Sequence, residues 1–239
     1  MNKYSPTPTL HSPKKISRRS LLKVGLTAGL VSYGITNTKQ VNSGTDTLET
    51  HTLRQTPRQT EGPFYPIEEQ DDKDVDLTQI KEKTQPAKGQ VIHVQGLVLD
   101  TDGNALNNAF VEIWQANTWG RYRHKRDPNT APLDPNFQGW GQTTTADNGR
   151  YGFKTILPGA YPAGPDWTRP PHIHFKVTRQ GFYGLTTQMY FPDQKLNDVD
   201  LILQNLPTAQ RDMVIAKRDH SDPNDAPTFV FDIVLLRAS

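Results

Sequence analysis

The sequence has no cysteine and only three methionines among its 239 residues. The absence of cysteine excludes disulfide bonds, thiolate metal ligands, a cysteine nucleophile and a lipid-modified N-terminal cysteine. Any bound metal must therefore use oxygen and nitrogen donors. An oxidising compartment would leave such a chain chemically unchanged.

The sequence also has little excess of either charge, with 27 basic and 25 acidic residues. Residues 1–35 hold six of the basic residues and no acidic ones, so removing those six from the 27 leaves 21 against 25, a net charge of −4. The weakly basic balance of the full chain thus belongs to its first residues. Nothing in this distribution predicts a nucleic-acid partner.

Residues 1–35 resemble a twin-arginine export signal. Arg18 and Arg19 precede a stretch of 12 uncharged residues, Val24 to Ile35. This stretch is too short to span a bilayer of about 30 Å but is typical of the hydrophobic part of a signal peptide. We expect a periplasmic or secreted protein with no membrane anchor in its mature form. The alternative is an ordinary N-terminal helix with a basic patch.

Residues 36–60 are polar and show almost no apolar periodicity, which predicts a flexible linker or arm. Order is expected to begin near Glu61, so that residues 61–239 form a single domain. From Val91 onward, short apolar or alternating runs are separated by turn residues. Asp102-Gly103 and Asn148-Gly149 are the strongest turn signals.

This pattern predicts an all-β fold, a β-sandwich of antiparallel or mixed sheets with one or two short helices. Two long segments rich in Pro and Gly, 121–142 and 157–171, interrupt the strands, and ordered loops of this length are usually functional. The expected strands cover residues 92–99, 109–115, 141–145, 150–156, 173–178, 185–191 and 228–236, and the expected helix covers 208–217.

His172 and His174 are the most informative residues of the chain. In an extended strand, residues i and i+2 point to the same face, so both imidazoles can reach one metal ion while Ile173 points to the other face. The alternative is two polar residues on a half-buried strand.

Two tyrosines lie in the interrupting loops, Tyr122 and Tyr161. A loop tyrosine is most often an aromatic residue with its hydroxyl in water. Two phenolates placed beside two neutral imidazoles would instead favour a hard trivalent ion such as Fe(III) over Zn(II) or Cu(I).

Several separated motifs, in order and with compatible spacing, resemble the intradiol ring-cleavage dioxygenases, and most of all the β subunit of protocatechuate 3,4-dioxygenase. The resemblance covers residues 90–236. Its motifs are Val111-Glu112-Ile113-Trp114-Gln115-Ala116-Asn117, Gly120-Arg121-Tyr122-Arg123-His124, Ala131-Pro132-Leu133-Asp134-Pro135-Asn136-Phe137, Pro158-Gly159-Ala160-Tyr161-Pro162, Arg169-Pro170-Pro171-His172-Ile173-His174-Phe175, Thr187-Gln188-Met189-Tyr190-Phe191-Pro192 and Phe231-Asp232-Ile233-Val234-Leu235.

The resemblance implies a non-haem Fe(III) enzyme that uses O₂ to cleave a catechol between its two hydroxylated carbons, giving a cis,cis-muconate-type diacid. It implies that residues 61–239 are the catalytic domain. It identifies the metal ligands as Tyr122, Tyr161, His172 and His174, with Tyr161 the tyrosinate that leaves when substrate binds. It further implies catalytic roles for Arg169, beside the substrate ring, and for Gln188.

One departure from the family pattern concerns the substrate. Protocatechuate enzymes commonly have Trp directly after the Tyr-Pro of the departing ligand, where this chain has Ala163. The identity of the catechol, protocatechuate or another, is therefore left open. The resemblance implies a homo-oligomer, and a companion α-type subunit is a further alternative.

Two other functions are compatible with the sequence. Residues 94–111 resemble the opening hairpin of transthyretin-like β-sandwiches, so the chain could be an exported binding module without catalytic iron. The two histidines could also belong to a secreted Zn or Cu protein. The colour of tyrosinate bound to Fe(III) would distinguish the dioxygenase from the binding module, and metal analysis with loss of colour on adding dithionite would distinguish it from the Zn or Cu protein.

Overall fold

The computed structural model describes residues 52–70, 72–219 and 226–239. These residues belong to the second of two units, Leu48–Ser239. The predicted signal peptide, 1–35, lies outside the described residues, as does most of the predicted arm. No helix among the residues described is long and apolar enough to cross a membrane.

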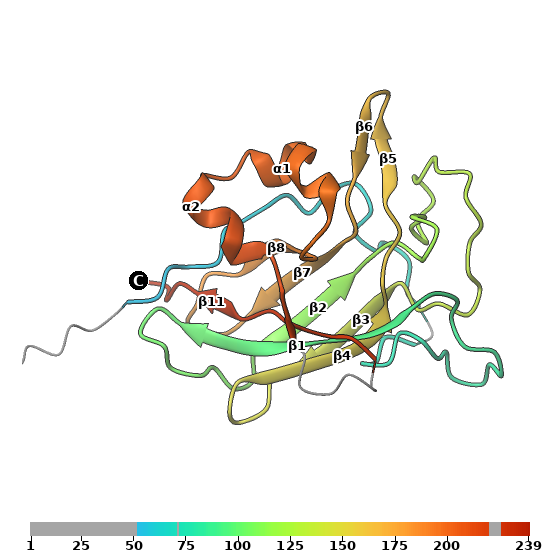
Figure 1. Ribbon diagram of the computed structural model, residues 1–239. Helices are drawn as coiled ribbons and strands as arrows, with labels where there is room; N and C mark the ends of the chain where they lie inside the picture. The colour runs from blue at the N-terminus through green and yellow to red at the C-terminus, as the bar shows by residue number, and fades with distance from the viewer. Residues whose placement is uncertain (1–51, 71, 220–225) are drawn as a thin grey trace, which may run out of the picture. The chain divides into compact units, whose positions relative to one another are not determined.

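Two β-sheets form the body of this unit (Figure 1). In the first, β1 (Val91–Asp100) pairs antiparallel with β4 (Arg150–Ile156) and parallel with both β10 (Thr228–Val230) and β11 (Ile233–Leu235), while β9 (Lys217–Asp219) extends the sheet beyond β10. The second sheet is antiparallel, in the order β3 (Trp140–Thr144), β2 (Phe110–Trp114), β7 (His172–Thr178) and β8 (Leu185–Tyr190). The prediction of an all-β sandwich is confirmed.

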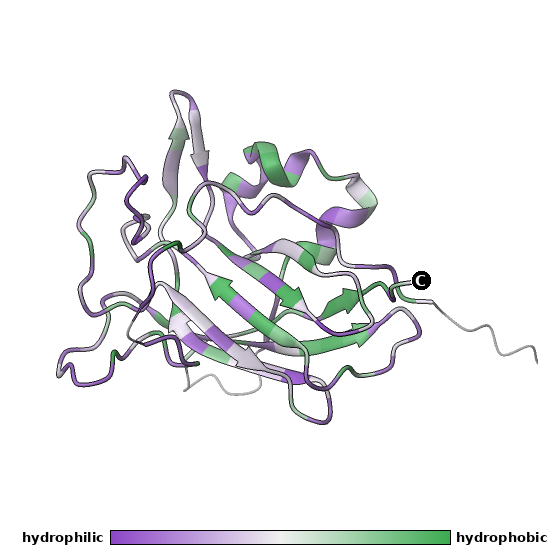
Figure 2. Ribbon diagram, turned by 180° about the vertical axis from the view of Figure 1, so that it is seen from behind, coloured by the Kyte–Doolittle hydropathy of each residue, from purple (hydrophilic) through white to green (hydrophobic). Residues whose placement is uncertain are grey.

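The core lies between the two sheets. Successive residues of β1 alternate between partly exposed and buried, as expected of a strand with one face toward a core. Its inward residues Ile92, Val94 and Val98 belong to the same buried cluster as Phe175 and Val177 of β7. Hydrophobic residues accordingly concentrate on the strands, while the surrounding loops are mostly polar (Figure 2).

The expected strand 228–236 is divided in two at Phe231 and Asp232. At this point Phe231 donates its N–H to Gln95 O at 2.8 Å, and the Asp232 carboxylate accepts from Leu97 N at 2.8 Å. A Cβ on Gly96 would lie 2.0 Å from Phe231 O, so only glycine allows this close approach. No local pattern predicts the division, because it depends on contacts with β1, which is far away in the chain.

The expected helix 208–217 is shorter than predicted. It consists of α2 (Thr208–Arg211) and a 3₁₀ turn, η2 (Asp212–Val214), after which the chain becomes extended. Ala216 donates its N–H to Tyr190 O at 2.9 Å, so pairing with the end of β8 ends the helix early. Two further short helices, η1 (Lys195–Val199) and α1 (Leu201–Gln204), precede it.

Order begins earlier than Glu61, where it was expected. Within the predicted arm, Thr56 donates its N–H to Val234 O at 3.1 Å and Gln59 donates to Thr186 O at 2.9 Å. The side chains of both residues are buried. Pairing of this kind uses main-chain groups and polar side chains, so apolar periodicity could not predict it.

Segment 157–171 was expected to be a loop but contains a short hairpin. Strand β5 (Tyr161–Gly164) pairs antiparallel with β6 (Trp167–Arg169), and the register shifts between Pro162 and Gly164. The hairpin projects beyond the two sheets (Figure 1). It places Tyr161 directly opposite Arg169.

Candidate metal centre and active site

Three separate elements bring the four predicted ligands together. Tyr122 lies in the loop between β2 and β3, Tyr161 is the first residue of β5, and His172 and His174 lie on β7. Their side chains are buried, with 2–7% of each residue exposed. Ile173, between the two histidines, belongs to the hydrophobic core, as the strand alternation predicted.

The four rings are close neighbours. Ring centroids are 5.5 Å apart for Tyr122 and Tyr161, 5.6 Å for Tyr161 and His172, 5.0 Å for the two histidines, and 6.1 Å for His174 and Tyr122. The Tyr122 hydroxyl lies 3.3 Å from His172 Nε2. We call these four residues the ring cluster.

Contacts with residues outside the ring cluster orient both imidazoles. His172 Nδ1 lies 2.7 Å from Pro170 O, so this nitrogen donates and Nε2 keeps its lone pair. His174 stacks on Trp114, with centroids 4.7 Å apart and an interplanar angle of 11°. His174 Nδ1 is buried with no hydrogen-bond partner. The pair therefore offers lone pairs to a cation rather than charge.

Burial sets the protonation of the ring cluster. It lowers the pKa of His172 well below the usual value, and the nearby Arg169 and His174 add to this shift. Burial and Arg169 lower the pKa of His174 in the same way. Burial raises the pKa of both Tyr122 and Tyr161, with Arg169 opposing the shift. At neutral pH both imidazoles are neutral, and the phenols ionise only if a cation compensates their charge.

Arg169 is buried beside the ring cluster and uses its whole guanidinium. Nε donates to Asp200 Oδ2 at 2.9 Å, and Nη1 lies 3.0 Å from His172 Nε2. Nη2 donates to Gln188 Oε1 at 2.8 Å, to the Tyr190 hydroxyl at 3.0 Å and to Asp200 Oδ1 at 3.3 Å. Composition alone would have placed this arginine on the surface, whereas it is 3% exposed.

Gln188 lies on β8, opposite His174 in the register with β7. It is fully buried. Its side-chain amide donates to Thr60 O at 3.0 Å while its carbonyl accepts from Arg169. The structure thus brings both predicted catalytic residues, Arg169 and Gln188, against the ring cluster.

Sequence reasoning missed several residues of the site, above all Asp200 and Tyr190. An Asp before the apolar run Leu201-Ile202-Leu203 is a helix N-cap signal, but it gives no indication of a contact with Arg169. Trp167 was also missed; its ring lies 5.7 Å from the Arg169 guanidinium carbon.

The two loops that carry the tyrosines pack against each other through glycines. Gly120 has a φ of +79°, and a Cβ there would lie 2.3 Å from Ala160 O. A Cβ on Gly159 would lie 2.5 Å from Gly120 N. Tyr122 is further fixed by the bond from its N–H to Asp127 Oδ2, at 2.7 Å. Only glycine permits the approach that brings the two phenols together.

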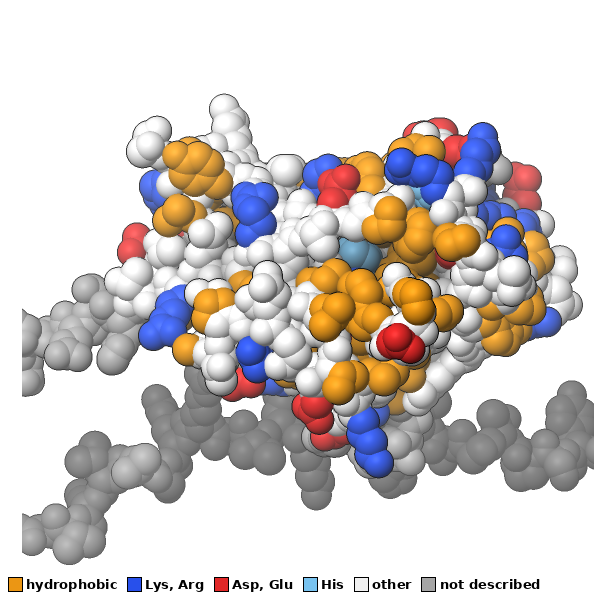
Figure 3. Space-filling view, turned by 90° about the horizontal axis from the view of Figure 1, so that it is seen from above, with side chains coloured by type: hydrophobic (Ala, Val, Ile, Leu, Met, Phe, Trp, Pro, Cys, Tyr) orange, Lys and Arg blue, Asp and Glu red, His pale blue; other side chains and the backbone are white. Residues whose placement is uncertain are grey.

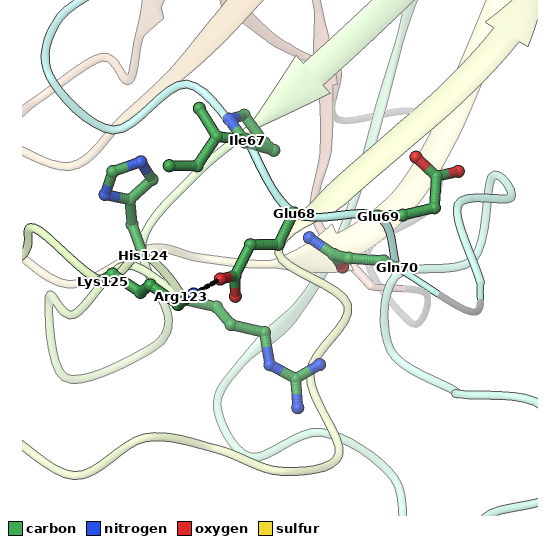
Figure 4. Close-up of a pocket in the computed structure, with 8 residues that line it drawn as sticks. Ile67, Glu68, Glu69, Gln70, Arg123, His124 and Lys125 are labelled. Carbon is green, nitrogen blue, oxygen red and sulfur yellow. Dashed lines mark ion pairs between the residues drawn. The ribbon is translucent and has the colours of Figure 1, made fainter.

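A separate cavity of about 260 Å³ lies beside the Tyr122 loop and is lined by residues 66–70 and 123–125 (Figure 4). Its lining is largely polar, and Glu68 forms an ion pair with Lys125. It contains none of the four rings. In the view from above, a histidine side chain is visible at the surface, bordered by hydrophobic side chains (Figure 3).

Oxygen donors from tyrosine are needed to complete any metal site at the ring cluster. In the part of the chain that the structure describes, no group of three or more His, Asp or Glu side chains is placed to hold a metal ion. The donors at hand are two imidazoles and two phenols, a set suited to a hard trivalent ion.

Comparisons with known proteins give one consistent result. A family model described as Dioxygenase matches residues 60–237. The protocatechuate 3,4-dioxygenase beta chain of Burkholderia cepacia is 45% identical over 188 residues, covering 77% of this chain and 80% of the relative. The catechol 1,2-dioxygenase of Acinetobacter baylyi is 32% identical over 204 residues, covering 76% of this chain but only 62% of the relative.

A solved structure has a similar fold. The dioxygenase domain of a dioxygenase carbohydrate-binding protein fusion from Streptomyces sp. SirexAA-E is 28% identical, with a TM-score of 0.57. The match covers 77% of this chain and all of that domain.

Proposed function

Because this chain belongs to the intradiol dioxygenase family, we propose that it cleaves a catecholic ring between its two hydroxylated carbons with O₂, giving a cis,cis-muconate-type diacid. The observation that supports this most directly is the convergence of two phenols and two imidazoles in one buried cluster. A binding module would have no need of such a set.

The proposed cofactor is a non-haem Fe(III) ion held by Tyr122, Tyr161, His172 and His174. Three features of the chain fit this ion: the lone pair that His172 keeps on Nε2, the unpartnered Nδ1 of His174, and phenols whose raised pKa requires a compensating cation. When bound, Fe(III) supplies the Lewis acidity that lowers the pKa of both catechol hydroxyls.

Tyr161 is proposed as the displaceable base. With an ion held at the ring cluster, its phenolate oxygen would accept a proton from the incoming catechol and give the neutral phenol that burial favours. Tyr161 is the first residue of β5, which pairs only with β6 and lies outside the two larger sheets. Tyr122, whose N–H donates to Asp127 and whose ring packs against Phe64, is proposed to stay in place.

Arg169 and Gln188 are proposed to act on the substrate. The lone pair of His172 Nε2 that now faces Arg169 Nη1 is the one a metal would use, so Nη1 becomes available to the substrate. There it stabilises negative charge that builds on the ring carbon during attack by O₂. Gln188, fixed by Thr60 and Arg169, orients the ring.

Substrate identity is proposed only as a class: protocatechuate or another substituted catechol. Ala163 lies at the register shift of the hairpin and is exposed. We propose that the small side chain at this position, where Trp is common in protocatechuate enzymes, leaves room for a substituent on the catechol ring.

Assembly and export are proposed on the same basis. The resemblance to a beta chain supports a homo-oligomer or an association with a companion α-type subunit. The leader at residues 1–35 supports export by the twin-arginine route to the periplasm or medium. Replacing Arg18 and Arg19 together by Lys should retain the precursor inside the cell.

Purified, iron-loaded protein tests the function. We expect a burgundy colour that dithionite bleaches, spectral shifts with a panel of catechols, and O₂ uptake with ring-cleaved product. A protein that is colourless and binds no iron, or one that contains Zn or Cu instead, and that cleaves no catechol would support one of the other two functions.

A further inference from the structure

Asp200 is a fully buried carboxylate that contacts Arg169 at two points. Its Oδ2 accepts from Nε at 2.9 Å and its Oδ1 faces Nη2 at 3.3 Å. We propose that Asp200 is a positioning residue, which holds the Arg169 guanidinium so that Nη1 faces the ring cluster. This inference rests on the proposed function, since it assigns Asp200 a part in ring cleavage through Arg169.

The pattern of donors explains why the position of Arg169 is fixed. A guanidinium is planar, so two contacts along one edge determine the direction of the remaining nitrogen. Nε and Nη2 are occupied by Asp200, Gln188 and Tyr190, which leaves Nη1 directed at His172 Nε2, 3.0 Å away. Without the carboxylate, rotation about the side-chain bonds would turn Nη1 away.

Asp200 is itself held rigidly by the element that follows it. As the N-cap of α1, it accepts from Ile202 N at 3.1 Å and from Leu203 N at 2.8 Å, both through Oδ1. The Tyr190 hydroxyl, 3.4 Å from Oδ1, adds a contact from β8. The carboxylate therefore has one orientation, set by the backbone of a different segment from the one that carries Arg169.

The opposite charges of Asp200 and Arg169 support the same positioning role as their geometry. Asp200 and Arg169 form an ion pair of which neither side chain is more than 4% exposed. A cation left without this partner would lie buried next to His172, where its charge is costly. Asp200 thus lets a positive group lie beside the imidazoles without a net buried charge.

The test is Asp200→Asn in the iron-loaded protein. Asn keeps the size and the N-cap function but removes the charge. We expect kcat to fall about 10- to 100-fold, as for other residues that orient a site residue from behind, with the KM for catechol changed less than about threefold. Iron content and visible spectrum should match those of the wild type, because no proposed ligand is altered.

Asp100→Asn is the matched control. Asp100 is also buried, accepts from the backbone N–H groups of Asp102 and Asn104, and pairs with an arginine, Arg237, at 3.1 Å. Both variants should unfold at a lower temperature than the wild type. Only the Asp200 variant should lose kcat per bound iron, and equal kcat in the two variants would overturn the proposal.

A double-variant cycle separates positioning from a general structural role. If Asp200 acts through Arg169, then adding Asp200→Asn to Arg169→Leu should lower kcat by no more than about twofold. Full additivity would overturn the proposal. If Asp200→Asn yields no folded protein, Asp200→Glu, which keeps the charge but moves the carboxylate, should show the same loss, and an unchanged kcat would overturn it.

Wild-type activity is measured first, so the two failures are distinct. If the iron-loaded wild type cleaves no catechol, the proposed function is wrong and this inference fails with it. If the wild type is active and Arg169→Leu is impaired but Asp200→Asn is not, only the inference is wrong.

Discussion

At the scale of single residues, burial determines the charge state of each group in the ring cluster. The two imidazoles are held neutral and the two phenols protonated. Two phenolates would neutralise most of the charge of a trivalent cation. Such a cation is therefore the electrostatic partner that suits this set of donors. Roles for the individual donors can therefore be tested one atom at a time.

Replacing Tyr161 by Phe removes one oxygen. We expect iron to stay bound by the other three residues, the visible tyrosinate band to change, and kcat to fall roughly 100-fold, the usual effect of losing a positioned acid or base. Stopped-flow absorbance with catechol should show slower substrate association. Full activity with an unchanged spectrum would contradict the role of Tyr161.

Tyr151→Phe is the control for this substitution. Tyr151 is equally buried and donates its hydroxyl to Phe231 O within the core, outside the ring cluster. It should lower stability while leaving the visible spectrum and kcat per bound iron as in the wild type.

The lowered pKa values of the histidines predict how stability depends on pH. In iron-free protein, between the unfolded pKa of about 6.5 and the lower folded values, the unfolded chain binds protons that the folded chain does not. Stability is thus fully present above about pH 6.5 and is lost as pH falls, by up to about 1.4 kcal/mol per pH unit for each histidine.

Urea unfolding between pH 7.5 and 5 measures this loss. A variant with Gln at both 172 and 174 should show a shallower dependence, because it lacks the two groups. An identical slope in the two proteins would mean that His172 and His174 titrate normally.

At the scale of elements, the meeting of the Tyr122 loop with hairpin β5–β6 decides whether the two phenols converge. Gly120→Ala should combine the strain of a positive φ with a collision at Ala160 O. We expect a loss of iron affinity, measured by iron titration, and a drop in the melting temperature, measured by calorimetry.

Gly181→Ala is the matched control for this collision. Gly181 has a φ of +82°, close to the +79° of Gly120, but a Cβ there would meet nothing within 4 Å. It should cost about 1 kcal/mol for the strained backbone alone and leave iron affinity unchanged. Equal losses of iron in the two variants would show that the loop contact is unimportant.

The elements also show what the sequence could and could not predict. Local signals were reliable: alternation located β1, and the glycines of Asp102-Gly103 and Asn148-Gly149 have positive φ, as expected of tight turns. The H-x-H spacing placed both imidazoles on one face of β7. Hairpin β5–β6 was missed because Tyr161-Pro162-Ala163-Gly164 neither alternates nor favours a strand.

Long-range features had no local signal. The parallel pairing of β10 and β11 with β1 joins segments more than 130 residues apart, and the Arg169–Asp200 pair depends on how α1 packs. The tyrosines were assigned through family resemblance, since a loop tyrosine looks the same in sequence whether it faces a metal or water. Local patterns thus predicted the strands and the histidine pair. Which strands pair with one another, and which side chain pairs with Arg169, became clear only from the fold.

At the scale of the whole molecule, a metal at the ring cluster would connect three elements of the fold through a single ion. Tyr122 comes from the loop between β2 and β3, Tyr161 from hairpin β5–β6, and the histidines from β7 of the second sheet. Binding to the folded state alone stabilises it by about 2.7 kcal/mol when free ligand is 100 times its Kd. For a domain of this size, that corresponds to a rise of roughly 5–10 °C in melting temperature.

Calorimetry with and without Fe(III) measures this rise, and limited proteolysis should show that iron protects segments 121–139 and 157–171. The variant with Gln at 172 and 174 keeps both loops but loses two donors, so iron should neither raise its melting temperature nor protect its loops. If iron stabilised this variant as much as the wild type, the ion would be bound elsewhere. If iron stabilised neither protein, the four side chains would not act together on one ion, and the proposed chemistry would lose its basis.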